Sequence, residues 1–82
     1  MGQEIKRIET TPVNSSNLKA VGHDASTNTL QVDFHNGAIY QYHPFTAEGY
    51  KMLLEADSVG AFFNTQIKTN TLLTVTKVQD KK

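Results

Sequence analysis

The side chains best suited to chemistry in this chain are a serine pair and a histidine–aspartate pair. Ser15 and Ser16 precede His23 and Asp24, and serine, histidine and aspartate are the parts of a hydrolytic triad. The chain has no G-x-S-x-G nucleophile elbow, and its 82 residues leave little room for a substrate cleft with an oxyanion hole. We therefore expect the serines to form turn or cap hydrogen bonds, and we predict no catalytic residue and no enzyme activity.

A metal site is the next chemistry to consider. The candidate ligands are His23, His35, His43, Asp24 and Asp33. No two histidines have the H-x-x-x-H spacing of a helical zinc site, and the chain has no cysteine to supply a thiolate. The five glycines are scattered, so they form no phosphate-binding loop. We predict no metal and no cofactor.

An aromatic segment is the strongest candidate for a binding surface. Tyr40-Gln41-Tyr42 falls in a predicted strand. Lysines within reach of it in a small domain are Lys19, Lys51 and Lys68. Exposed rings beside cations stack unpaired bases in many RNA-binding domains, whereas tyrosines on a strand are more often core residues with a wet hydroxyl. The two interpretations differ in whether Tyr40 and Tyr42 face solvent.

Charge and composition limit the partners that this chain can have. Its eight basic and eight acidic residues cancel, whereas tight non-specific nucleic-acid binding needs several cations facing phosphates. The first ten residues lack the apolar core of a signal peptide, and no segment approaches the roughly 20 apolar residues of a membrane span. With no cysteine for disulfides, the sequence predicts a cytoplasmic protein without a membrane partner.

Periodicity and turn residues predict the elements that position these side chains. Strands are expected near Leu18–Asp24, over residues 30–34, where apolar and polar residues alternate, over residues 38–43, and as a possible last strand over residues 72–78. Thr46 and Ser58 are expected to cap two short helices between the last two strands. These elements predict an α+β fold of order β-β-β-α-α, with a possible C-terminal strand and both helices on one face of a small antiparallel sheet. We expect a flexible leader over residues 1–12, a single domain over residues 13–78 and a flexible tail over residues 79–82.

The turn at Asn36-Gly37 decides which way the tyrosines point. A two-residue turn would pair Phe34 with Ile39 and place both tyrosines on the face opposite Phe34. A three-residue loop with Gly37 in a left-handed conformation would pair Phe34 with Ala38 instead. We favour the three-residue loop because it gathers the large side chains on one face, which makes the tyrosines core or core-edge residues.

From Val13 onward the chain resembles the KTSC domain family. The segments that carry the resemblance are V-N-S-S-N-L-K-A-V-G-H-D (Val13–Asp24), L-Q-V-D-F-H-N-G (Leu30–Gly37), the central Y-Q-Y (Tyr40–Tyr42) and S-V-G-A-F-F-N-T-Q-I-K (Ser58–Lys68). The family is named for a C-terminal extension of some lysyl-tRNA synthetases, and it also occurs as small free-standing bacterial and phage proteins. His23 departs from the pattern, since an aromatic usually stands there, as does the missing tyrosine after the second helix.

The resemblance implies a small α+β fold around the Y-x-Y strand and suggests an association with RNA. Carried over to this chain, it marks Tyr40, Tyr42 and Lys68 as candidate RNA contacts. Because the charge is neutral and the chain is small, we predict a protein-interaction or accessory module with an unknown protein partner. A weak RNA-binding module that uses the Tyr40-Gln41-Tyr42 strand is the alternative.

Overall fold

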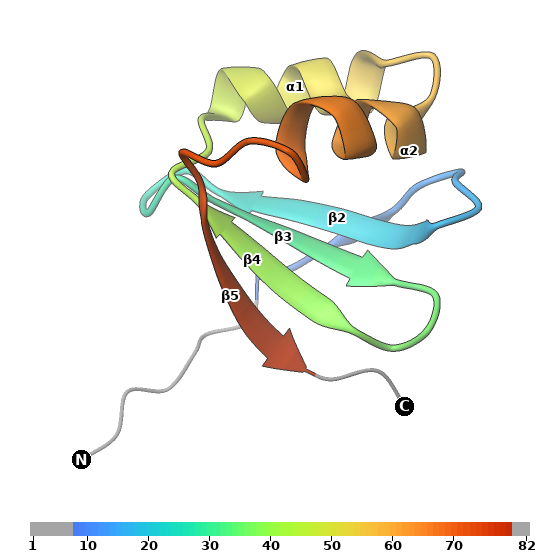
Figure 1. Cartoon of the computed structure of the whole chain (residues 1–82), viewed down its shortest axis with the longest axis horizontal. Helices are drawn as coiled ribbons and strands as arrows, with labels where there is room; N and C mark the ends of the chain where they lie inside the picture. The colour runs from blue at the N-terminus through green and yellow to red at the C-terminus, as the bar shows by residue number, and fades with distance from the viewer. Residues whose placement is uncertain (1–7, 80–82) are drawn as a thin grey trace.

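The computed structural model describes residues 8–79, which form one antiparallel sheet with all of the helical segments on one face (Figure 1). The strands are β1 (Thr11–Pro12), β2 (Leu18–Asp24), β3 (Thr29–Phe34), β4 (Ile39–His43) and β5 (Thr74–Gln79), and they lie in that order across the sheet. The helical segments are α1 (Ala47–Glu55), α2 (Val59–Phe62) and a π-helical turn, η1 (Phe63–Ile67). The predicted α+β class, the last strand and the one-sided packing of the helices are confirmed.

The sheet begins earlier and ends later than the predicted domain. In β1, Thr11 pairs with Val21 and Pro12 pairs with Ala20, although residues 1–12 were expected to form a leader. Only two residues pair here and both side chains are exposed, so no apolar alternation marks this strand in the sequence. At the other end, β5 includes Gln79, the first residue of the expected tail. The remaining residues of the expected leader and tail, 1–7 and 80–82, lie outside the described residues.

The hairpin between β3 and β4 closes through the three-residue loop. The Phe34 amide donates to the Ala38 carbonyl at 2.9 Å, and the Gly37 amide donates to the Phe34 carbonyl at 3.0 Å. Gly37 has a φ of 97°, a conformation that side chains with a Cβ rarely adopt. In the resulting register, Val32 lies opposite Tyr40 and Leu30 lies opposite Tyr42. The prediction that both tyrosines share the face of the apolar β3 residues is therefore confirmed.

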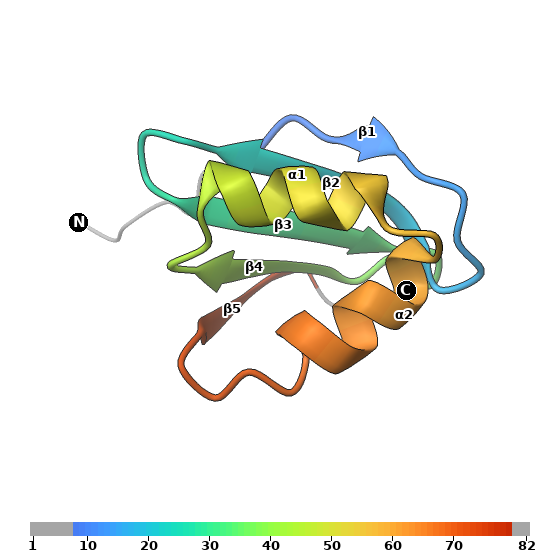
Figure 2. The ribbon, with the colours of Figure 1, turned by 90° about the horizontal axis from the view of Figure 1, so that it is seen from above.

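The helices lie over this face of the sheet (Figure 2), and buried side chains of both layers form the hydrophobic core. Its buried members are Leu18, Val21, Leu30, Val32 and Tyr42 from the strands and Leu53, Phe63 and Ile67 from the helical segments. Both helix caps form as predicted, since Thr46 accepts from the Gly49 amide at 3.1 Å and Ser58 accepts from the Ala61 amide at 3.2 Å. The caps fix where each helix starts and thereby which helical side chains face the sheet.

The opposite face of the sheet is covered in part by the segment that precedes β1. A Cβ on Gly22 would lie 2.1 Å from the Glu9 carbonyl oxygen, so only glycine leaves room for the chain to cross β2 there. Gln31 is only 2% exposed on this face. Its side-chain oxygen accepts from the Ile8 amide at 2.8 Å and from the Gln41 amide group at 3.0 Å. These hydrogen bonds satisfy a buried polar side chain and tie residues 8–10 to the sheet.

Candidate functional site

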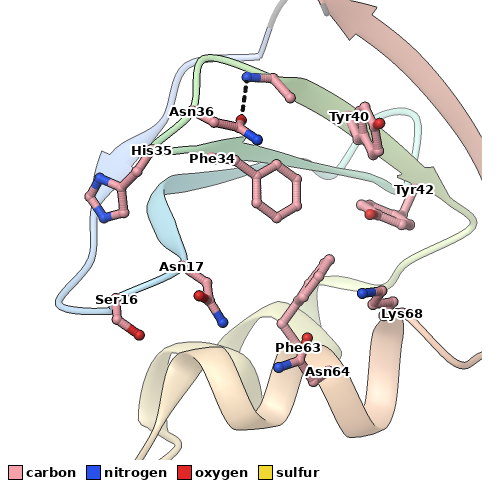
Figure 3. Close-up of a pocket in the computed structure, with 11 residues that line it drawn as sticks. Ser16, Asn17, Phe34, His35, Asn36, Tyr40, Tyr42, Phe63, Asn64 and Lys68 are labelled. Carbon is pink, nitrogen blue, oxygen red and sulfur yellow. Dashed lines mark hydrogen bonds between the residues drawn. The ribbon is translucent and has the colours of Figure 1, made fainter. Parts of the chain in front are cut away.

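A groove of about 690 Å³ lies between the β3–β4 hairpin, the segment before β2 and the turn η1 (Figure 3). Its largest side chains are the rings of Phe34, Tyr40, Tyr42 and Phe63. In Figure 3 these rings lie next to one another, with Asn17 and Lys68 on opposite sides of them. The groove is therefore built by segments far apart in the sequence.

The four rings form a continuous wall of edge-to-face contacts. Phe34 contacts Tyr40 and Phe63 with ring centroids 5.7 Å and 5.6 Å apart, and Tyr42 contacts Phe63 at 5.6 Å. The interplanar angles lie between 72° and 78°, the geometry in which the positive edge of one ring meets the negative face of the next. Each ring is held by at least one other, so the wall is preformed.

The two tyrosines contribute differently to the groove. Tyr42 is 4% exposed and belongs to the core, whereas Tyr40 is half-buried at the edge of the core. Burial of the hydroxyl, with a smaller effect of the neighbouring Tyr40, raises the pKa of Tyr42 to about 12. The Tyr42 hydroxyl therefore enters the site as a neutral donor or acceptor at physiological pH. Tyr40, which is less buried, offers more of its ring to a ligand.

Short polar side chains form the rim of the groove on the hairpin side. The Asn36 side-chain oxygen accepts from the Ala38 amide at 3.0 Å, which orients the Asn36 side chain within the loop. His35 Nε2 donates to the Ser15 carbonyl at 2.9 Å and links this loop to the segment before β2. Asn17, Asn64 and Ser16 complete the polar lining. The rim thus offers amide and hydroxyl groups that can exchange hydrogen bonds with a ligand backbone.

The π-helical turn places Lys68 beside the ring wall. The Lys68 amide donates to the Phe63 carbonyl at 2.8 Å, five residues back. In an α-helix, five residues at about 100° each would leave Lys68 roughly 140° around the axis from Phe63. The wider turn of η1 reduces that angle, and both side chains line the same groove. π-Turns inside helices occur often at functional sites.

All three residues marked by the resemblance, Tyr40, Tyr42 and Lys68, line this one groove. The other two lysines considered with them do not, since Lys19 borders a neighbouring hollow and Lys51 lies on α1. Sequence reasoning missed Phe34, Phe63 and the asparagines as site residues. The signal that could have found them is the resemblance itself, because its four segments supply every residue that lines the groove except Ala38.

The serines and the His23–Asp24 pair of the triad hypothesis lie at opposite ends of β2. Ser15 accepts from the Asn17 and Leu18 amides, the turn role expected for it. Asp24 accepts from the Ser26 amide and hydroxyl.

His23 occupies an aromatic position in the packing. Its ring stacks on Tyr50 with centroids 5.4 Å apart, and its Nε2 is hydrogen-bonded to the Phe45 carbonyl. Tyr50 in turn donates from its hydroxyl to the Val21 carbonyl at 3.3 Å, and burial raises the pKa of this hydroxyl. His23, which departs from the family pattern, therefore fills the place of an aromatic ring between α1 and β2.

Within residues 8–79, no three histidines, aspartates or glutamates come together in a way that could hold a metal ion. The helices in this part of the chain are all too short or too polar to cross a membrane.

Comparisons with known proteins agree with the fold and with the segments that build the groove. The KTSC domain model matches residues 14–70. An uncharacterised protein of Stutzerimonas stutzeri is 41% identical over 56 residues, which cover 68% of this chain and 79% of that protein. A protein of Tsukamurella paurometabola is 39% identical over 57 residues, covering 70% and 85% of the two chains. The crystal structure of a KTSC domain protein of Yersinia pestis is 27% identical, with a TM-score of 0.79 over 89% of this chain and all of that one. The descriptions of these proteins name no synthetase, no activity and no ligand, so the RNA association stays a prediction.

Proposed function

Since this chain belongs to the KTSC domain family, whose matched segments meet at the groove, we propose that it is a protein-interaction module that binds an extended segment of a partner protein there. The observation that carries the proposal is the preformed wall of four rings bordered by short amide side chains. Ligand sites commonly combine apolar walls with a few oriented polar groups in this way.

The size and chemistry of the groove suit a peptide. A volume of about 690 Å³ lies within the range of roughly 300–1,000 Å³ that is typical of ligand sites. The ring wall can take one or two apolar side chains of a partner, and the asparagines on the rim carry both donors and acceptors that match those of a peptide backbone. Aromatic side chains are also enriched where protein interfaces concentrate their binding energy.

Weak RNA binding is the second candidate, and one observation favours it. The half-buried ring of Tyr40 and the ammonium group of Lys68 line the same groove, so a base on the ring could place its phosphate near the lysine. Tyr42 is too deeply buried to offer a ring face, and the net charge of the chain is zero. RNA affinity depends on several phosphate contacts, so these features favour a protein segment.

Selection of peptides on the immobilised domain tests the proposal. A random peptide library displayed on phage would be panned against the wild-type protein, and recovered peptides would be assayed against Tyr40→Ala and Lys68→Ala. Lys51→Ala is the matched control, because Lys51, on α1, is also an exposed lysine but lies outside the groove. Short single-stranded RNA of mixed sequence, titrated at low salt, gives the comparison for the second candidate.

We expect peptides with apolar side chains whose binding falls at least about tenfold in Tyr40→Ala and is unchanged in Lys51→Ala. If no peptide binds in a way that depends on Tyr40, the protein-interaction proposal fails. RNA binding that is weakened by salt and lost in Tyr40→Ala would then support the second candidate.

A further inference from the structure

We propose that the groove recognises the free C-terminal carboxylate of a partner protein, with the apolar side chain of its last residue against the ring wall. The inference deepens the proposed function, since it rests on the groove being a protein-binding site.

Lys68 lies beside the ring wall. Through the turn η1, its side chain lines the groove on the same side as Phe63, whose ring is part of the wall. Phe63 is 3% exposed and contacts both Phe34 and Tyr42, so this part of the wall is rigid. The ammonium group of an exposed lysine therefore stands next to a fixed apolar surface.

The lining of the groove is rich in hydrogen-bond donors and has no acidic residue among the described residues, and Lys68 is basic. The Asn36 oxygen is engaged by the Ala38 amide, which leaves its amide nitrogen as the group available to a ligand. The hydroxyl of Tyr42, whose pKa burial raises to about 12, is protonated at neutral pH. A site with these donors and no carboxylate favours an anionic, acceptor-rich ligand.

The cation and the apolar wall are neighbours in the groove. In a C-terminal residue the carboxylate and the side chain are both attached to the α-carbon, so a single residue can reach Lys68 and the rings together. The carboxylate of an internal aspartate or glutamate lies at the end of its own side chain and brings no apolar group with it. Capture of a C-terminal carboxylate is a recurrent mode of peptide recognition.

The test is a pair of peptides that differ only at the terminal group. Peptides would be selected from a library displayed with free C-termini, and the best apolar-ended sequence would be synthesised as the acid and as the C-terminal amide, both with a fluorophore at the N-terminus. Fluorescence anisotropy would give the affinities for the wild type, Lys68→Ala, Lys68→Arg and Lys51→Ala. Lys68 and Lys51 are both exposed, and amide NMR spectra of the variants check that each is folded.

We expect the acid to bind the wild type at least about tenfold more tightly than the amide, because a hydrogen bond to a charged group is lost in the amide. The acid-to-amide ratio should fall close to one in Lys68→Ala, recover in Lys68→Arg and remain unchanged in Lys51→Ala. A merely structural role for Lys68 would weaken both peptides equally and would not change the ratio.

Three results would overturn the inference, and they can be told apart. If acid and amide bind equally and both depend on Tyr40, the groove binds protein segments but does not recognise a chain terminus. If neither peptide binds, the inference and the proposed function fail together. If the protein binds adenosine monophosphate and neither peptide, the anion preference of the groove is for phosphate. That result also contradicts recognition of a carboxylate.

Discussion

Single residues connect the core of this domain to its groove. The ring of Tyr42 is buried between the sheet and Phe63, yet the residue also lines the groove. Phe63 in turn bridges Tyr42 and Phe34. Substitutions of these two residues test the packing, whereas Tyr40 and Lys68 are at the edge of the core or exposed and can be changed to test binding.

Phe63→Ala should destabilise the fold by about 3–5 kcal/mol, the usual cost of removing a buried phenylalanine ring. Phe63 is 3% exposed and holds two neighbouring rings. Phe62→Ala is the control, since Phe62 is half-buried at the margin of the core and its loss should cost less. Urea unfolding would measure both variants. An equal loss of unfolding free energy in the two variants would show that Phe63 is not central to the core.

Tyr42 should make the fold sensitive to alkaline pH. Its pKa is raised from 10.0 to about 12 in the folded state, so the neutral form is favoured by folding. The stabilisation that comes from burying neutral Tyr42 is complete below the pKa of tyrosine in the unfolded chain. It is lost as the pH rises through the pKa of Tyr42 in the folded state, that is, between about pH 10 and pH 12. Urea unfolding across this range should show a steeper loss of stability in the wild type than in Tyr42→Phe. Parallel curves for the two proteins would contradict the assignment.

At the scale of elements, the three-residue hairpin loop sets the whole aromatic face. The strands β3 and β4 have a period of two, so a shift by one residue would send Tyr40 and Tyr42 to the opposite face. This choice was predictable from the sequence, because only one register collects the large apolar groups together. The π-turn was not, since the apolar residues of 59–67 recur at a spacing that also fits an ordinary α-helix.

Gly37→Ala tests the loop. The φ of 97° at this position is strained for any residue with a Cβ, and we expect a loss of about 1–2 kcal/mol. Gly37→Asn should cost less, because asparagine tolerates positive φ better than alanine does. Thermal unfolding would compare the three proteins. An alanine variant as stable as the wild type would argue for a different loop and a different register.

Gln31→Ala tests the polar contacts on the other face of the sheet. It removes the buried oxygen that accepts from the Ile8 amide and from the Gln41 side chain, and the loss of the partner of the Ile8 amide alone costs about 1–3 kcal/mol. Hydrogen exchange of the Ile8 amide should accelerate. Gln66→Ala, at an exposed position on η1, serves as the control. Unchanged exchange at Ile8 would contradict the role given to Gln31.

At the scale of the whole molecule, the groove is built from segments that only the fold brings together. The strands β2, β3 and β4, the helix caps and the α+β class follow from alternation and capping residues, which are local signals. The short strand β1 has no such signal, because its two side chains are exposed. Tyr40, Tyr42 and Lys68 were predicted from an aromatic strand with lysines in reach, and the family resemblance then selected Lys68 from those lysines. Their neighbours Asn17, Phe34 and Phe63 join them through contacts between distant segments, which no local pattern specifies.

The measurement that tests the central claim most directly is an amide NMR titration of the isotope-labelled domain with the best free-acid peptide from the display selection. We predict shift changes that cluster on residues around the groove, including Asn17, Asn36, Tyr40, Asn64 and Lys68, and that disappear in Tyr40→Ala. Changes confined to the exposed side of α1 around Lys51 and Met52, or to β5, would contradict the account and place the binding surface elsewhere.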